Sequence, residues 1–220
     1  MGLIAEQDRT YLQDEFDRME HPVRLVLFTR ESDCQFCRET RQIVEELTSL
    51  SDNVQTEIFD LQADAEHAQA LGVDKAPAIV LLRADNEPSD YGIRYYGIPS
   101  GYEFSSLVED ILMIGRGDSG LQAATREALA DLKVPVHIQV FVTPTCPYCP
   151  RAVHMAHQMA FESPLVHADM VEAMEFPDLA VKYDVMGVPR IVINEETHVE
   201  GAVPEPVMLQ AVLEAVEQKA

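Results

Sequence analysis

The four cysteines of this 220-residue chain form two pairs, and two residues separate the sulfurs in each pair. Cys34 and Cys37 lie in CQFC, and Cys146 and Cys149 lie in CPYC, so no cysteine is left over. Thiols at this spacing can form a disulfide, and the second thiol can attack a mixed disulfide formed at the first. The pattern therefore predicts dithiol–disulfide exchange at two sites, with Cys37 and Cys149 as shielded resolving thiols inside helices.

The residues around the second pair predict a strand-to-helix turn. The apolar run 136–142 is typical of a buried strand, and 152–161 is helical in character. We expect Cys146 near the helix N-cap and Pro147 at the first helical position, where the missing N–H costs nothing. Cys149 then lies about one turn further in. Free N–H groups and the helix dipole stabilise a thiolate at such a position, where pKa values of ~3.5–7.5 are usual.

The second half of the chain repeats the first. Pro77 follows Cys34 by 43 residues, and Pro189 follows Cys146 by the same distance. Each half predicts the element order helix–β–α–β–α–β–β–α, with a CxxC motif after the first strand. A βαβ unit that carries a CxxC motif is typical of thioredoxin-like redox domains.

A turn-rich segment separates the two halves. Residues 115–120, GRGDSG, contain the residues that favour irregular backbone and are the best linker candidate. We therefore expect two domains, an N-terminal thioredoxin-like domain over 1–118 and a C-terminal thioredoxin- or glutaredoxin-like domain over 119–220. The expected fold class is α/β, with a mixed central sheet flanked by helices in each half.

Composition restricts the partners and the location. The chain has 38 acidic and 16 basic residues and a formal net charge of −22, which argues against binding to nucleic acid or anionic membranes. A solvated acidic surface explains this charge, and adaptation to high salt is the alternative. No apolar run has membrane-spanning length, and residues 1–20 lack the basic and apolar regions of a signal peptide. We therefore expect a cytoplasmic protein, in which a structural disulfide framework would be unusual.

The tandem motifs resemble a known family. CQFC and CPYC, the proline 43 residues after each first cysteine, and the passage through His21-Pro-Val-Arg-Leu into a strand are similar to the two-domain protein disulfide oxidoreductases. These proteins, also called glutaredoxin-like proteins, occur in thermophilic prokaryotes. The resemblance covers essentially the whole chain. It implies two thioredoxin folds joined into one extended sheet, disulfide reductase, oxidase or isomerase activity, and no cofactor besides the cysteine pairs.

The resemblance also implies residues that bind substrate. It implies that Pro77 and Pro189 are cis and lie beside their CxxC motifs. The backbone of the preceding residue, Ala76 or Val188, is then free to pair with an extended substrate segment. Tyr148 is expected to flank the sulfurs of the second site, with ordinary packing as the alternative.

Two features depart from thioredoxins. Thioredoxins keep a buried acid about six residues before the first cysteine, but Phe28 and Val140 occupy these positions here. Thioredoxins also place a tryptophan before the first cysteine, and this chain has no tryptophan. The sites are therefore more glutaredoxin-like, and no residue is an obvious candidate for the acid that transfers a proton.

The two sites differ in the charges nearest to them in sequence. Asp33 directly precedes Cys34, and a carboxylate disfavours a thiolate. The residues near Cys146 include no acid; they are Thr143, Thr145, Arg151 and His154. We predict the lower pKa at Cys146 and the main exchange with protein substrates there, while the first pair relays electrons or acts as a weaker site. Equivalent sites are the alternative, because neighbours in sequence are a poor guide to neighbours in space.

Several alternatives remain open at this stage. By resemblance, protein disulfides are the substrates and a thioredoxin reductase-like flavoprotein is the electron donor. The chain could instead relay electrons to a peroxidase, a role that needs only one CxxC motif. It could also bind metal, either as a four-cysteine zinc site or as an iron–sulfur glutaredoxin, although a whole domain separates the two pairs. His154 and His157 lie three residues apart, but no carboxylate stands at a suitable offset, so no histidine metal site is predicted.

Overall fold

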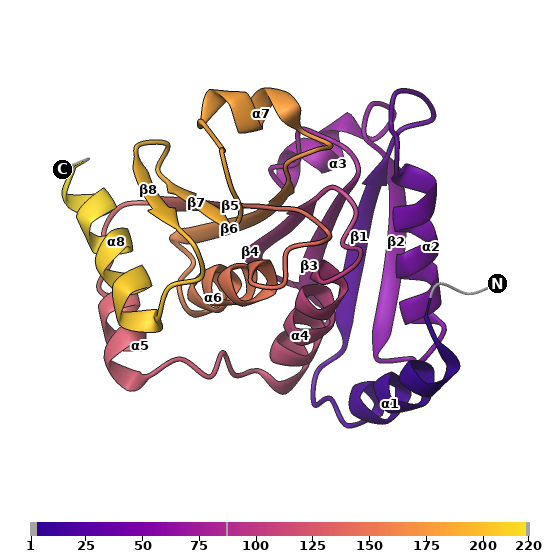
Figure 1. Ribbon diagram of the computed structural model, residues 1–220. Helices are drawn as coiled ribbons and strands as arrows, with labels where there is room; N and C mark the ends of the chain where they lie inside the picture. The colour runs from indigo at the N-terminus through magenta and orange to yellow at the C-terminus, as the bar shows by residue number, and fades with distance from the viewer. Residues whose placement is uncertain (1–3, 87, 219–220) are drawn as a thin grey trace. The chain divides into compact units, whose positions relative to one another are not determined.

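The computed structural model describes residues 4–86 and 88–218 (Figure 1). The chain forms two compact units. Unit 1 consists of Met1–Asp90, Tyr95–Ile98 and Ile111–Asp118, and unit 2 consists of Tyr91–Arg94, Pro99–Asp110 and Ser119–Ala220. None of the helices in the described part combines the length and the apolar character needed to cross a bilayer.

Unit 1 is built around a buried central strand. In chain order the elements of the first half are α1 (Glu6–Asp17), β1 (Val23–Thr29), α2 (Cys37–Thr48), β2 (Val54–Asp60), α3 (Ala65–Ala70), β3 (Ala78–Arg83), β4 (Ser89–Tyr96) and α4 (Glu103–Arg116). Strand β1 pairs with β2 in parallel and with β3 in antiparallel orientation. Side chains on both faces of β1 are buried, so its sequence is an almost continuous apolar run.

Helix α2 follows the first CxxC motif and packs through one apolar face. Its buried side chains include Thr40, Ile43, Val44 and Leu47, which recur at the three- and four-residue spacing of a helix. The face opposite these residues carries the charged side chains. This burial fixes the start of the helix relative to the end of β1, which is where the cysteine pair lies.

Unit 2 repeats the same order of elements. They are α5 (Ala123–Ala130), β5 (Val136–Val142), α6 (Cys149–Glu162), β6 (Val166–Glu172), α7 (Pro177–Lys182), β7 (Arg190–Ile193), β8 (Thr197–Glu200) and α8 (Glu205–Glu217). Strand β5 pairs with β6 in parallel and with β7 in antiparallel orientation, and β7 pairs with β8. The predicted repeat and the predicted α/β class, a mixed sheet flanked by helices, are confirmed.

A glycine lets one loop of unit 2 approach the segment before the second CxxC motif. Gly101 adopts a positive φ of 61°, and a Cβ at this position would clash with the carbonyl oxygen of Pro144. The N–H group of Tyr102 donates a hydrogen bond to the same oxygen at 3.0 Å. The loop therefore supports the turn that carries Cys146.

We expect Gly101→Ala to destabilise unit 2. A side chain in the left-handed region and the contact with Pro144 together cost about 1–3 kcal/mol of unfolding free energy. Urea denaturation measures this loss. Gly187→Ala is the matched control, because a Cβ at Gly187 meets no atom within 4 Å. Equal losses in the two variants would contradict the proposed support of the Cys146 turn.

Candidate active site

Both cysteine pairs are disulfide-bonded and lie at the same place in their units. The Cα atoms of Cys34 and Cys37 are 5.5 Å apart, as are those of Cys146 and Cys149. Each pair follows the first strand of its half, and the second cysteine of each pair is the first residue of a helix, α2 or α6. The predicted strand-to-helix turns are confirmed.

The predicted start of the second helix is wrong by two residues. Helix α6 begins at Cys149 and has Tyr148 as its N-cap, so Cys146 and Pro147 precede the helix. The residues before Cys149 form a turn instead, in which the Cys146 N–H donates to the Thr143 carbonyl at 3.1 Å. Pro150 takes the early helical position, where a missing N–H is tolerated.

The helix N-terminus nevertheless faces the first sulfur of the second site. The N–H of Cys149 donates a hydrogen bond to Sγ of Cys146 at 3.1 Å. In unit 1 the sulfur that accepts a backbone hydrogen bond is Sγ of Cys37, from the N–H of Arg30 at 3.3 Å. The two sites therefore share a scaffold but stabilise different sulfurs.

The cysteines also differ in burial. Cys149 is fully buried and Cys37 is 7% exposed, as expected for shielded resolving thiols. Cys146 is also only 7% exposed, whereas Cys34 is half-buried.

Each predicted proline lies at the strand end that leads to its CxxC motif. The Ala76–Pro77 and Val188–Pro189 peptide bonds are both cis, as the resemblance implied. Phe28 of β1 is paired with Ala78, so Pro77 lies level with the end of β1, five residues before Cys34. The same register places Pro189 level with the end of β5. Both prolines are buried, and the residues before them are half-buried.

The repeat allows the surfaces around the two sites to be compared position by position. Three positions are polar in unit 1 and apolar 112 residues later in unit 2; they are Gln62, Gln69 and Asp74 against Met174, Val181 and Met186. The three unit 2 side chains are 77%, 80% and 89% exposed, and Tyr148 is 70% exposed. We call these four residues of unit 2 the apolar rim. The three equivalent positions of unit 1 line one pocket, so we expect their unit 2 counterparts on one surface, and exposed apolar patches are typical of interaction sites.

A buried acid lies beside the second site at a position that the sequence analysis missed. Glu172 is the last residue of β6 and pairs with Val142, four residues before Cys146. It is 3% exposed, and burial raises the pKa of its carboxyl group. This acid does not stand at the offset before the cysteine that is usual in thioredoxins, because it comes from the neighbouring strand. The repeat offered a signal, since Asp60 occupies the equivalent end of β2.

A second missed carboxylate connects α4 with α6. Asp110 is fully buried, and one of its oxygens is 2.9 Å from Nδ1 of His154, while the other contacts Nδ1 of His157. Burial alone would raise the pKa of Asp110, but the two histidines hold this pKa below its ordinary value. The sequence showed the histidine pair without its acid, which lies on a helix far earlier in the chain. No group of three or more potential metal ligands suited to an ion occurs in residues 4–86 and 88–218.

Glu103 begins α4 next to the loop that supports the Cys146 turn. It is 1% exposed, and its carboxylate accepts a hydrogen bond from the Ser106 hydroxyl at 2.7 Å. Burial, assisted by the nearby charge of Asp110, raises the pKa of Glu103 to about 7.

Comparison with known proteins places both units among thioredoxin-type folds. A family model described as a thioredoxin domain matches residues 136–214. A crystal structure of a protein disulfide oxidoreductase from Aeropyrum pernix has a TM-score of 0.90 and 33% identity, covering 97% of this chain and 94% of that chain. The NTD_N/C domain of alkylhydroperoxide reductase AhpF from Enterococcus faecalis has a TM-score of 0.87 and 29% identity, covering 95% and 99%.

A curated relative is much longer than this chain. The alkyl hydroperoxide reductase AhpF of Pseudomonas aeruginosa is 26% identical over 193 residues, which is 88% of this chain and 34% of that protein. The chain therefore spans about a third of the length of this relative.

The raised pKa of Glu103 predicts a pH dependence of stability. The folded state holds this proton more tightly than the unfolded state, so the contribution is complete below the ordinary pKa of 4.5 and is lost as the pH rises through about 7. Urea denaturation at about pH 5 and about pH 8 should therefore show Glu103→Gln gaining stability relative to wild type at the higher pH. The exposed Glu127 provides the control, and an equal gain in Glu127→Gln would contradict the assignment.

Proposed function

Because the chain belongs to the two-domain protein disulfide oxidoreductases with tandem thioredoxin-fold units, we propose that it catalyses thiol–disulfide exchange on protein disulfides. The observation that carries this proposal is the hydrogen bond from the first N–H of α6 to Sγ of Cys146. A thiolate at this position is stabilised by the helix N-terminus and is the reactive form of the cysteine.

The proposed reaction transfers two electrons from a reduced cysteine pair to the substrate. The Cys146 thiolate attacks one sulfur of a protein disulfide, and the other substrate sulfur leaves as a thiolate and takes up a proton. The Cys149 thiolate then attacks Sγ of Cys146, which forms the Cys146–Cys149 disulfide and releases the second substrate thiol. We assign the same chemistry to Cys34 and Cys37. No cofactor besides the cysteine pairs is required.

Substrate contacts are proposed for the loops that carry the cis-prolines. The backbone of Ala76 or Val188, with Pro77 or Pro189, would pair with an extended substrate segment. Tyr148 would pack beside a segment bound at the second site, and its exposure supports this role. We retain 1–118 and 119–220 as the proposed domains.

We propose that the second site is dominant on protein substrates. Its apolar rim offers surface to the apolar segments that flank disulfides in partly unfolded proteins, whereas the equivalent unit 1 positions are polar. The hydrogen bond to Cys146 supports the lower thiol pKa at this site. The Cys34–Cys37 pair would then relay electrons or act on other disulfides.

The proposed partners follow from the same chemistry. Protein disulfides would be the substrates, and a thioredoxin reductase-like flavoprotein would restore the dithiol. The reducing cytoplasm suits two sites that must be kept as dithiols. Neither nucleic acid nor a membrane is a proposed partner, given the net charge of −22.

A second candidate function is electron relay to a peroxidase. Its support is the similarity to the AhpF domain of Enterococcus faecalis, of which this chain covers 99%. Two cysteine pairs, where a relay needs one, favour the general oxidoreductase.

We expect Cys146→Ser to abolish most of the insulin reduction that the protein catalyses with dithiothreitol. The rate should fall by about tenfold or more, because the proposed attacking thiolate is lost, whereas Cys34→Ser should retain most of the rate. Turbidity of the precipitating insulin chains measures both. Equal losses would mean that the sites act in parallel. A wild-type rate no better than dithiothreitol alone would contradict the exchange function.

The apolar rim generates a separate prediction. The variant Met174→Gln/Val181→Gln/Met186→Asp gives unit 2 the residues of unit 1 at these positions. It should raise KM for insulin several-fold, because the lost apolar contact weakens binding by roughly 1 kcal/mol. Reduction of 2-hydroxyethyl disulfide, which is too small to span the rim, should be unchanged. Val207→Gln, an exposed apolar residue on α8, is the control. An unchanged KM for insulin would exclude the rim as a docking surface.

A further inference from the structure

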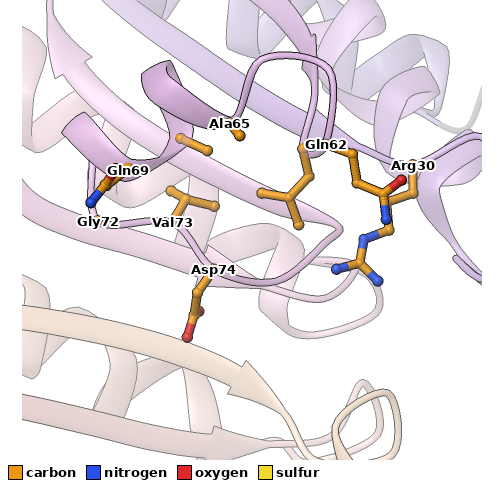
Figure 2. A pocket seen from close by; sticks show the side chains of 9 residues that line it. Arg30, Gln62, Ala65, Gln69, Gly72, Val73 and Asp74 are labelled. Atoms are coloured by element: carbon orange, nitrogen blue, oxygen red, sulfur yellow. The ribbon is translucent and has the colours of Figure 1, made fainter.

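Unit 1 contains a pocket that the proposed exchange reaction does not explain. It has a volume of about 640 Å³ and lies between α3, the end of β1 and the loop after α3. Figure 2 shows Gln69 at one end of the pocket and Arg30 at the other, with Asp74 below them in this view. A volume of this size is typical of small-molecule sites, which are roughly 300–1,000 Å³.

Arg30 connects the pocket with the first cysteine pair. Arg30 lines the pocket with its side chain, while its backbone N–H donates to Sγ of Cys37 at 3.3 Å. On the opposite side, Asp74 lines the pocket three residues before the cis-proline Pro77. A molecule bound to the Arg30 side chain would therefore be separated from Cys37 by this one residue.

The Nε of Arg30 is a donor that an anion could accept from. It is buried and has no hydrogen-bond partner within the part of the chain that the structure describes. The backbone N–H groups of Ala63 and Gln62 lower the pKa of Asp60, and the charge of Arg30 adds to this effect; Oδ1 of Asp60 accepts these two N–H groups at 2.9 Å each. A buried donor without a partner costs free energy, so a ligand that accepts a hydrogen bond from it would be stabilised in the pocket.

The other polar groups of the pocket also suit a small charged ligand. Gln62 and Gln69 contribute amide groups that can donate or accept. The carboxylate of Asp74 is paired with the Lys75 ammonium. Arg30 is the basic residue among the described residues that line the pocket.

The repeat indicates that this polarity is not required by the fold. The residues 112 positions after Gln62, Gln69 and Asp74 are apolar; they are Met174, Val181 and Met186. The first residue after β5, Thr143, corresponds to Arg30 and carries no charge. The charged and amide groups of the lining are therefore a property of unit 1.

We propose that this pocket binds the carboxylate of a low-molecular-weight disulfide and presents its sulfur to Cys34. A guanidinium binds a carboxylate through two parallel hydrogen bonds, which fixes the orientation of the ligand. The inference rests on the proposed exchange chemistry and names the substrate class of the first site. Thus the first site takes small anionic disulfides, and the second takes protein disulfides.

The reaction at this site consumes one small disulfide per turnover. The Cys34 thiolate attacks the ligand disulfide, forms a mixed disulfide and releases one ligand thiolate. The Cys37 thiolate attacks Sγ of Cys34, forms the Cys34–Cys37 disulfide and releases the second thiolate, and both take up protons from water. Two electrons pass from the cysteine pair to the ligand.

The test uses the full chain with Cys146→Ser/Cys149→Ser, in which only the first site can react. The reduced protein is mixed with 3,3′-dithiodipropionate, which carries two carboxylates, or with 2-hydroxyethyl disulfide, which carries none. Acid quenching, alkylation and mass measurement follow the oxidation of Cys34 and Cys37. Added Arg30→Gln should raise the half-saturating concentration of dithiodipropionate about tenfold and leave that of the neutral disulfide within about twofold.

The control keeps the charge change but moves it out of the pocket. Arg38 is exposed, follows Cys37 directly and does not line the pocket, so Arg38→Gln should leave both disulfides unaffected. Arg30→Lys keeps the positive charge and should retain part of the preference for the anion, which separates loss of charge from loss of folding.

The outcomes separate the inference from the function on which it rests. If both disulfides oxidise the first pair with equal half-saturation, or if Arg38→Gln acts like Arg30→Gln, the pocket assignment is overturned while the exchange chemistry stands. If neither disulfide oxidises the pair, the exchange function proposed for this site is overturned, and the inference falls with it.

Discussion

The contact between a helix N-terminus and a cysteine sulfur is the constraint on which unit 2 depends. The first N–H of α6 faces Sγ of Cys146 only because three supports hold the helix and the turn in place. The apolar face of α6 is buried, Gly101 allows a loop to hold the Pro144 carbonyl, and Asp110 holds His154 and His157 on the same helix. These supports use close packing or a buried charge to hold α6 and the turn that carries Cys146.

Two buried acids near these supports cost free energy of folding. Asp110 and Glu103 are buried acids near one another on α4, and burying carboxylates is unfavourable unless they are paired or protonated. Asp110 is stabilised as a carboxylate by two histidines, whereas Glu103 holds its proton up to about pH 7. The two acids differ in protonation because histidines contact Asp110, whereas the Ser106 hydroxyl contacts Glu103.

Comparison of the two units distinguishes the features that the fold requires from the surface residues that determine which partner binds. Both units keep the strand order, the CxxC turn and the cis-proline, since these set the geometry of the sulfurs. The exposed positions around the prolines are not constrained by packing, so they are free to differ. Unit 2 carries an apolar rim and unit 1 a polar pocket with Arg30, and this difference is the basis for proposing two kinds of partner for one chemistry.

The sequence by itself determined the features that depend on local pattern and spacing. The two cysteine pairs, the buried strands before them, the prolines 43 residues later and the repeat of the whole unit follow from residue types at short or fixed separations. Tertiary structure alone decided which groups meet the sulfurs and each other. The start of α6 at Cys149 depended on a turn within the folded unit, and Glu172 and Asp110 reach their positions from other elements. Pairings between distant residues are set by packing in three dimensions, which periodicity along the chain does not record.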